Sequence, residues 1–470
     1  MLRNSAARVQ PGCFEILKFD IPTEKNRDVF VIMGSVKASK SRKICGISIE
    51  VELKQMKKYE KKMLPWLQSE ILTWIRQNTR MRTDSVIYSD CLGSPDSAMQ
   101  EIVQSIVISG DLSNSSIALD DVDFYFYQSN NHGPEAENLD MDTDTAEEVT
   151  ASNHWILPSS EFVGLWENLI FDDDVKENIL RYMQTSLIFA ESKINTNLIS
   201  CNRIILLHGP PGTGKTSLCR AVAQKVSIRF QDRYKHIHLV EINSHSLFSK
   251  WFSESGKLVQ KVFTQLRELI ETPNTMVCIL IDEIESVAFS RTAISNNEPS
   301  DSIRAVNAVL TQLDQIRKFT NVIVLATSNL TSNIDEAFLS RADIIQFIPP
   351  PCEAALQQIY VTILRELVST GIARISHRNQ RHVLLQKLLE GELDAQEVGF
   401  LPEFLHLCQL SRGISGRTVR KLPFLAHANF IDEHEKRSKH GVDLLEFIKA
   451  MSAAMAKHIS DSDCVNKPLK

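Results

Sequence analysis

A segment of eight residues at positions 209–216 constrains this chain more than any other feature of its sequence. It reads Gly-Pro-Pro-Gly-Thr-Gly-Lys-Thr and follows directly on a short apolar run at residues 204–207. Glycines let the backbone turn tightly and bring its N–H groups close to phosphate oxygens, and a helix that begins there points its N-terminus at the anion. Between a strand and a helix, this is the P-loop pattern. A glycine-rich turn with a purely structural role is the alternative interpretation.

The loop assigns a role toward ATP to each of its polar side chains. Lys215 can reach the β- and γ-phosphates, and the Thr216 hydroxyl can ligate Mg²⁺. The predicted nucleotide-binding residues are Gly209, Pro210, Pro211, Gly212, Thr213, Gly214, Lys215, Thr216 and Ser217.

A second apolar run, at residues 277–281, ends in two carboxylates, Asp282 and Glu283. We expect Asp282 to hold Mg²⁺ and Glu283 to orient and polarise the attacking water. Buried strands also often end in acidic residues that cap a helix, so the pattern is weak by itself. Its position downstream of a P-loop makes the catalytic interpretation the stronger one.

A third run, at residues 322–326, leads into Thr327, Ser328 and Asn329. Polar residues at the carboxyl end of a strand lie where open α/β sheets bind their ligands. We expect Asn329 to contact the γ-phosphate or the lytic water. Seen alone, the Ser-Asn pair would be read as a turn.

Apolar runs of strand length alternate with helical stretches over residues 154–350, which predicts a parallel sheet covered by helices on both faces. The runs lie at residues 204–207, 239–242, 277–281, 322–325 and 344–348. A triple proline at 349–351 then breaks the chain, and residues 351–458 read as a small helical subdomain. Its first apolar stripe consists of Leu356, Ile359, Tyr360, Ile363, Leu364 and Leu367.

Residues 1–128 are predicted to form a separate α+β domain. Apolar and polar residues alternate over 47–53 and 122–126, the period of half-buried strands, and residues 14–19 and 29–33 are further short candidates. A helical stripe of Leu67, Ile71, Trp74 and Ile75 reads as core.

Two segments are predicted to lack fixed structure. Residues 129–153 are acidic and poor in apolar groups, which indicates a mobile linker; an acidic docking motif is the alternative. The polar tail at 459–470 is expected to fray.

Composition narrows the setting. The net charge of -6 lacks the basic excess usual for proteins that live on nucleic acid. The nine cysteines form no Cys-x-x-Cys pair, which argues against a zinc site and a disulfide framework and favours a reducing compartment. No apolar stretch approaches the ~20 residues that span a bilayer, and no secretory signal is read. Neither a membrane nor a nucleic-acid partner is therefore expected.

In this order, the P-loop, the Asp282–Glu283 strand end and Asn329 resemble the AAA+ ATPase core, with Asn329 as sensor 1. Residues 306–314 resemble the helix before sensor 1, and 335–343 resemble the arginine-finger segment. The resemblance implies that Arg341 reaches the γ-phosphate of a neighbouring subunit. Many relatives carry two arginines there and this chain has one.

Two more site assignments follow from the AAA+ resemblance. Residues 413–418 look like sensor 2, which places Arg417 on the helical lid. For Arg341 and Arg417 alike, a surface cation or a local salt bridge is the alternative. The segment after the run at 239–242 occupies the place of a pore loop that grips a substrate chain. Its candidate residues are Lys250, Trp251 and Phe252, and a core role is the alternative for the two aromatics.

A closer resemblance is carried by residues 162–167, 247–259 and 420–428, which look like the pachytene checkpoint protein 2 family, also called thyroid hormone receptor interactor 13. This resemblance runs from about residue 155 to 428. It implies a homohexamer, with ATP and Mg²⁺, that pulls closed HORMA-domain proteins open, disassembles checkpoint complexes and clears meiotic chromosome axes. It also implies that the N-terminal domain receives substrate, often through a HORMA-type adaptor. The expected location is the nucleus and chromosomes, and also the cytoplasm. Within the nucleotide site, we expect the adenine to lie near Phe171 and the helical lid.

Two other functions use the same ATPase core. A nucleic-acid motor is one, since fold alone does not fix function. A lysine cluster can touch phosphate, although its helical spacing favours a solvated face; it consists of Lys54, Lys57, Lys58, Lys61 and Lys62. A scaffold switched by bound nucleotide is the other.

Overall fold

A computed structural model of the chain gives the fold. It describes residues 47–54, 63–77, 86–92, 98–110, 122–139, 149–172, 174–192, 194–195, 198–244, 255–286, 300–329, 334–376, 380–390, 401–432 and 441–466. The strand candidates at 14–19 and 29–33 lie outside these residues. Among the helices in these ranges, none combines the length and apolar character needed to cross a bilayer.

The N-terminal part forms a four-stranded sheet in the order β2-β3-β1-β4. Its strands are β1 (Ile47–Leu53), β2 (Val86–Tyr88), β3 (Val103–Ser109) and β4 (Val122–Tyr127). Helices α1 (Leu64–Gln77) and α2 (Ala98–Ile102) supply apolar side chains to one core with the strands. The helical stripe read from the sequence is confirmed, because Leu67, Ile71 and Ile75 are buried there. The half-buried strand predicted at 47–53 is wrong in one respect, since all seven residues of β1 are buried.

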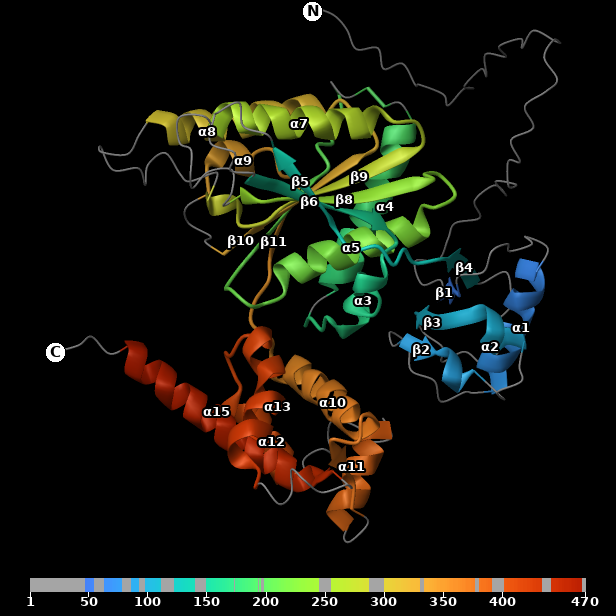
Figure 1. Cartoon of the computed structure of the whole chain (residues 1–470), viewed down its shortest axis with the longest axis vertical. Helices are drawn as coiled ribbons and strands as arrows, with labels where there is room; N and C mark the ends of the chain where they lie inside the picture. Colours follow the sequence, from blue (N-terminus) through green and yellow to red (C-terminus); the bar gives the residue numbers. More distant parts are fainter. Residues whose placement is uncertain are drawn as a thin grey trace, which may run out of the picture. The chain divides into compact units, whose positions relative to one another are not determined.

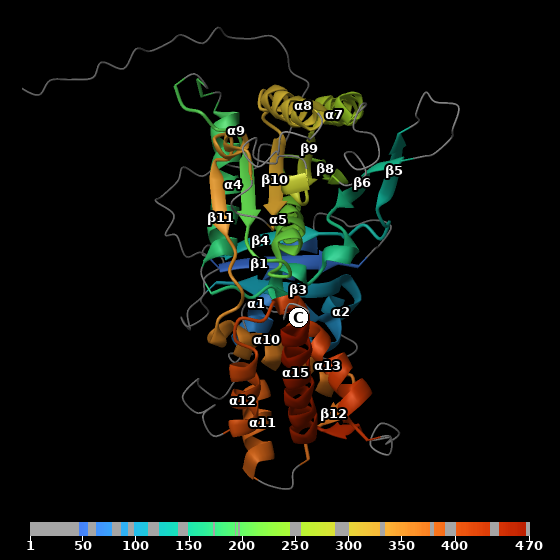
Figure 2. The same ribbon diagram turned by 90° about the vertical axis from the view of Figure 1, so that its left-hand side faces the viewer.

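The central part is a seven-stranded sheet in the order β11-β7-β10-β9-β8-β6-β5. Figure 2 shows it running from β11 at one edge to β5 at the other. The five predicted runs are all strands and pair in parallel: β7 (Ile204–His208), β8 (His236–Ile242), β9 (Thr275–Ile281), β10 (Val322–Ser328) and β11 (Ile344–Phe347). Parallel strands buried on both faces read as continuous apolar runs, which is why the sequence shows them so plainly.

Helices cover both faces of this sheet, as the alternating pattern predicts (Figure 1). On one face α7 (Ser255–Glu271), α8 (Ser300–Ile316) and α9 (Glu336–Leu339) contribute to one core. On the other face α3 (Leu165–Asn168), α4 (Val175–Glu191) and α5 (Lys215–Arg229) contribute to a second.

Part of the predicted linker at 129–153 is ordered sheet, which corrects that prediction. β5 (Glu135–Leu139) pairs antiparallel with β6 (Val149–Leu157), and β6 pairs antiparallel with β8. The acidic side chains of β5 suit an edge strand, where charge remains in solvent and blocks further pairing. Glu137 also accepts a hydrogen bond of 2.8 Å from the Ser152 hydroxyl.

The C-terminal part is helical, as predicted, with a small parallel pair of β12 (Ala373–Arg374) and β13 (Val442–Asp443). Its helices are α10 (Glu353–Ser369), α11 (Gln380–Glu390), α12 (Pro402–Leu410), α13 (Gly416–Phe430) and α15 (Leu444–Asn466). They enclose a single apolar cluster. The frayed tail predicted at 459–470 is wrong as far as Asn466, because α15 continues to that residue and Ile459 packs against the cluster.

Two phenylalanines on the C-terminal helices allow a matched test of this core. The exposed fraction is 1% for Phe404 and 77% for Phe424. We expect Phe404→Ala to lower the free energy of unfolding of the helical part by about 3–5 kcal/mol, since it leaves a cavity. Phe424→Ala should change it by less than about 0.5 kcal/mol. Hydrogen exchange of the slowest α10 amides, on dilute protein, measures both. Equal losses in the two variants would contradict the position of the core.

Candidate nucleotide-binding site

The P-loop turns sharply between β7 and α5 because its glycines take conformations closed to other residues. Gly209, Gly212 and Gly214 have φ values of 147°, 78° and 97°. A Cβ on Gly209 would lie 2.3 Å from the carbonyl oxygen of Ile348, and one on Gly212 would lie 2.8 Å from Ser415 Oγ. The loop therefore fits closely between the end of β11 and the start of α13, and only glycine satisfies both contacts.

The Lys215 ammonium lies inside the loop. Its Nζ donates to the carbonyl oxygens of Gly209 and Pro210 at 2.9 and 2.8 Å. Burial lowers the pKa of Lys215, and the positive charge of Arg417 acts in the same direction, while the carboxylates of Glu285 and Asp282 oppose both. An ammonium held inside the loop by carbonyl oxygens is placed to bind the phosphates of a nucleotide there.

Asp282 is tied to the helix α5 through Thr216 and to the strand β10 through Thr327. Thr216 Oγ1 donates to Asp282 Oδ1 at 2.8 Å, and the Thr327 hydroxyl hydrogen-bonds the same oxygen. β9 and β10 run parallel with Ile281 opposite Ala326, so the residues that follow meet at the same edge of the sheet. A hydroxyl and a carboxylate oxygen held together are ligands that Mg²⁺ prefers, so Thr216 and Asp282 fit this ion.

Glu283 adopts a strained backbone that directs it into the site. Its φ is 53°, in the left-handed region that side chains rarely adopt, and its N–H donates to Thr327 Oγ1 at 3.1 Å. Asn329 Nδ2 lies 3.4 Å from Glu283 Oε1. The structure thus brings together the predicted water-activating carboxylate and the predicted sensor 1. Strain of this kind is found where a side chain must be held for function.

The two predicted arginines occupy different surroundings. Arg417 lies at the start of α13 and its N–H donates to the Gly212 carbonyl at 3.1 Å, which joins the lid to the P-loop. Arg341 makes a bidentate ion pair with Asp314, with nitrogen–oxygen distances of 2.9 and 2.8 Å. This contact lowers the pKa of Asp314 and raises that of Arg341. Arg341 therefore forms a local salt bridge in the single chain.

A cavity of about 390 Å³ opens beside the P-loop. Ile170, Phe171, Ile348 and Ile359 give it apolar walls, and Arg417, Arg420 and Lys421 line the side formed by α13. Apolar walls with a few convergent polar groups are typical of ligand pockets. The position beside Phe171 and the lid agrees with the place expected for the adenine.

Two functional positions escaped the sequence reading. Thr327 bridges Asp282 and Glu283. Pairing the two predicted parallel strands would have placed Thr327 opposite Asp282, since Ala326 lies opposite Ile281. Glu285 accepts a hydrogen bond of 2.9 Å from the Asn329 N–H, and its other oxygen is buried with no hydrogen-bond partner among the described residues. A third acid two residues after Glu283 was the available signal. Lys250, Trp251 and Phe252 lie outside the described residues.

The fold and this constellation define a P-loop ATPase with a helical lid. Residues 205–350 match the family model of the ATPase family associated with various cellular activities (AAA). Residues 352–459 match a second model, described as the TRIP13-like, AAA+ ATPase lid C-terminal domain.

Similar proteins identify the family within the AAA+ ATPases to which this chain belongs. The Homo sapiens pachytene checkpoint protein 2 homolog is 47% identical over 353 residues, covering 75% of this chain and 78% of that protein. The Danio rerio homolog is 49% identical over 306 residues, or 65% of this chain and 70% of that protein. The solved structure of C. elegans PCH-2 superposes with a TM-score of 0.70 at 33% identity and covers 88% of this chain and 100% of that one. The chain belongs to the pachytene checkpoint protein 2 (TRIP13) family, and it is an ATP hydrolase of the AAA+ class.

The bridging hydroxyl of Thr327 yields a test of this geometry. Thr327→Val keeps the shape of the side chain but removes both hydrogen bonds, so Asp282 and Glu283 lose their common support. We expect kcat for ATP hydrolysis to fall about 10–100-fold, as for other groups that orient ligands from behind. Thr327→Ser, which keeps the hydroxyl, should retain most of the activity. A steady-state phosphate-release assay on both variants measures kcat. Wild-type kcat in Thr327→Val would show that the bridge is dispensable.

Proposed function

We propose that this ATPase remodels HORMA-domain proteins, converting their closed, partner-bound form into the open form and so disassembling checkpoint and meiotic axis complexes. The observation that carries the proposal is a hydrolytic site joined to a lid of the TRIP13-like type. Family membership supports the choice of HORMA-domain substrates. The proposed assembly is a homohexamer, with a HORMA-type adaptor delivering substrate to the N-terminal domain, in the nucleus, on chromosomes and in the cytoplasm.

The chain's own residues divide the work of hydrolysis. The P-loop backbone and Lys215 bind the phosphates, and Thr216 with Asp282 would hold Mg²⁺, which neutralises phosphate charge when it is bound. Glu283, held by Thr327 and Asn329, is placed to accept a proton from the attacking water. Arg417 links the lid to the P-loop, because its backbone N–H donates to the Gly212 carbonyl. Arg341 is proposed to act on the site of a neighbouring subunit.

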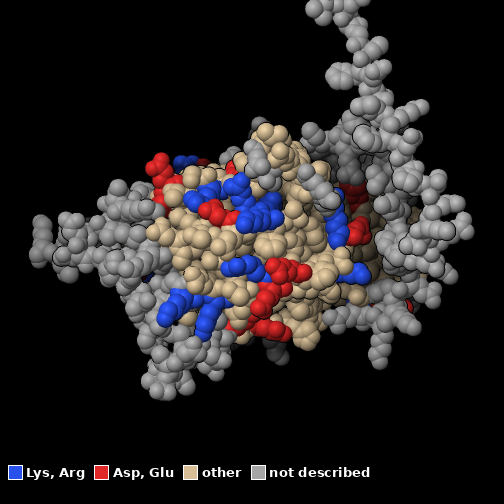
Figure 3. Space-filling view, turned by 90° about the horizontal axis from the view of Figure 1, so that it is seen from above, with Lys and Arg blue, Asp and Glu red and all other residues tan. Residues whose placement is uncertain are grey.

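The described surface gives little support to a nucleic-acid motor. Lys54, the member of the lysine cluster within the described residues, donates to the Gln100 carbonyl at 2.6 Å. On the face drawn in Figure 3, basic side chains alternate with acidic and uncharged ones and form no continuous basic stripe over the described part. A protein that tracks phosphates usually carries such a stripe.

ATP turnover with and without substrate tests the remodelling function. We expect a closed HORMA-domain protein together with its adaptor to raise turnover severalfold, because gripping is coupled to hydrolysis. Trp251→Ala should abolish this rise. Glu283→Gln is the control: it should bind ATP without turnover and release no closed complex, whereas a nucleotide-switched scaffold would keep its activity. Turnover raised by DNA and unmoved by the HORMA pair would overturn the proposal.

The trans role of Arg341 has a separate test by mixing. Lys215→Ala removes phosphate binding in its own subunit but leaves Arg341 intact, and Arg341→Ala does the reverse. Each variant alone should be inactive. Randomly mixed in equal amounts, they should recover up to roughly a quarter of wild-type turnover, because that fraction of interfaces pairs an intact P-loop with an intact finger. A mixture as inactive as its components would place Arg341 outside the neighbouring site.

A further inference from the structure

The strand β1 buries its polar face as completely as its apolar one. Ser48, Glu50 and Glu52 have exposed fractions of 9%, 1% and 7%. Alternation of this kind normally leaves polar residues in solvent. Two buried carboxylates on one short strand therefore require partners, because an unpaired buried charge is strongly unfavourable.

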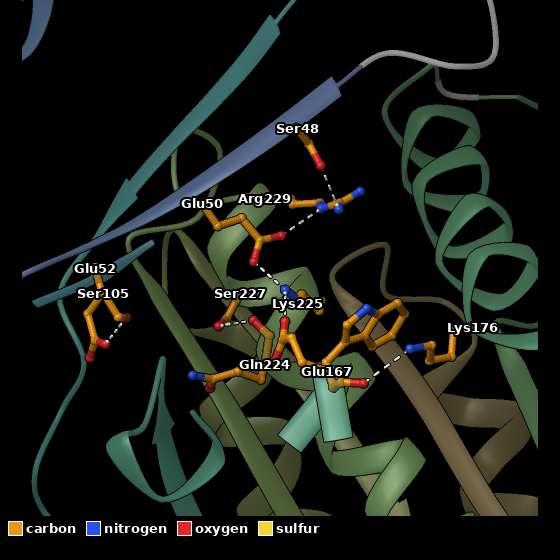
Figure 4. Close-up of polar contacts among 11 residues, drawn as sticks. Ser48, Glu50, Glu52, Ser105, Glu167, Lys176, Gln224, Lys225, Ser227 and Arg229 are labelled. Atoms are coloured by element: carbon orange, nitrogen blue, oxygen red, sulfur yellow. Dashed lines mark hydrogen bonds and ion pairs between the residues drawn. The ribbon is translucent and has the colours of Figure 1, made fainter. Parts of the chain in front are cut away.

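The partners of Glu50 come from the helix that carries the P-loop (Figure 4). Glu50 forms an ion pair with Lys225 and a second one, at 3.3 Å, with Arg229. Lys225 also pairs with Glu167 of α3 at 2.7 Å. Burial acts to lower the pKa of Lys225, but the carboxylates of Glu50 and Glu167 outweigh it and hold that pKa above its ordinary value. Two carboxylates and two cations balance in charge.

Two members of this cluster, Lys225 and Glu167, lie on segments that also form the nucleotide pocket. Lys225 is ten residues from Lys215 on the same helix, a distance of about 15 Å at the helical rise. Glu167 lies just before the residues that form the wall beside the P-loop, Leu169 to Asp172. The neighbours of Glu167 are anchored too: Lys176 Nζ donates to the Trp166 carbonyl at 3.2 Å, and Arg420 of the lid donates to the Asn168 carbonyl.

We propose that Glu50 is a positioning residue for ATP binding: through Lys225 it fixes Glu167 and the pocket wall, so that docking of the N-terminal sheet and occupation of the nucleotide site are energetically coupled. Only when β1 lies on α5 are all four charges satisfied. Removing one partner of a buried ion cluster leaves an uncompensated charge, so separation of β1 from α5 is strongly unfavourable. Because coupling is reciprocal, bound nucleotide in turn holds the N-terminal sheet on the helix.

Glu52 provides a matched control on the same strand. Its carboxylate accepts hydrogen bonds from Ser105 of β3 and from Ser129, just after β4, at 2.7 and 2.6 Å. Both partners belong to the N-terminal part of the chain and neither lies on α5. Glu50→Gln should weaken binding of a fluorescent ATP analogue about tenfold, a typical coupling between sites. It should raise KM for ATP with little change in kcat. Glu52→Gln should alter the affinity less than twofold. Equal effects of the two variants, or none from Glu50→Gln, would overturn the proposal.

A second measurement separates positioning from loss of fold. In the wild type, ATP should slow hydrogen exchange of β1 amides, and in Glu50→Gln it should not. The triple variant E50M/K225M/E167M replaces the three most deeply buried charges by apolar groups, which often preserves stability. It leaves Arg229, whose side chain is 16% exposed and also donates to the Ser48 hydroxyl. The triple variant should keep the thermal midpoint but bind the analogue as weakly as Glu50→Gln. Wild-type affinity in the triple variant would show that packing alone suffices. Neither measurement involves a HORMA-domain protein, so a negative result here would leave the proposed remodelling function standing.

Discussion

Parallel pairing of β7, β10 and β9 is the constraint on which the site depends. β10 aligns Ser328 with His208 on one side and Ala326 with Ile281 on the other. This register brings the start of the P-loop, Asp282 and Thr327 to one edge of the sheet, although the chain separates them widely. A shift of a single residue would turn every side chain of a strand to the opposite face. Burial of both faces opposes such a shift, so the apolar interior of the sheet maintains the geometry of the polar edge.

The helix α5 extends this dependence away from the phosphates. Eleven of its residues are buried, from Lys215 at the P-loop to Ile228 near its end. A helix packed on nearly all sides moves as a unit, since close-packed interiors transmit displacement rather than absorb it. Loss of one partner from a buried ion pair costs roughly 3–5 kcal/mol. The Lys225 cluster therefore opposes separation of the N-terminal sheet from the P-loop helix.

Local patterns in the sequence predicted most of the fold and picked out most of the residues that the structure brings together at the candidate site. The central strands were readable because both of their faces are buried, and the P-loop, Asp282, Glu283 and Asn329 were readable because each follows a strand. The predictions that failed concern contacts between distant residues. Glu50 and Lys225 are 175 positions apart, and nothing in the alternation of β1 marks its polar face as buried. The acidic composition of β5 was equally compatible with a linker and with an edge strand, and only the pairing with β6 decides between them.

The ion pairs of Lys225 and Arg341 differ in burial, and burial sets what each can do. The side chains of Lys225, Glu50 and Glu167 are 4%, 1% and 6% exposed, so water cannot replace a lost partner and the cluster is fixed. Those of Arg341 and Asp314 are 28% and 49% exposed. A pair so open to solvent is worth only about 0–1 kcal/mol. A phosphate offers a guanidinium stronger, charge-assisted and bidentate hydrogen bonds. If Arg341 serves the site of a neighbouring subunit, as proposed, Asp314 keeps the finger ordered in the free chain and releases it at little cost when a phosphate comes within reach.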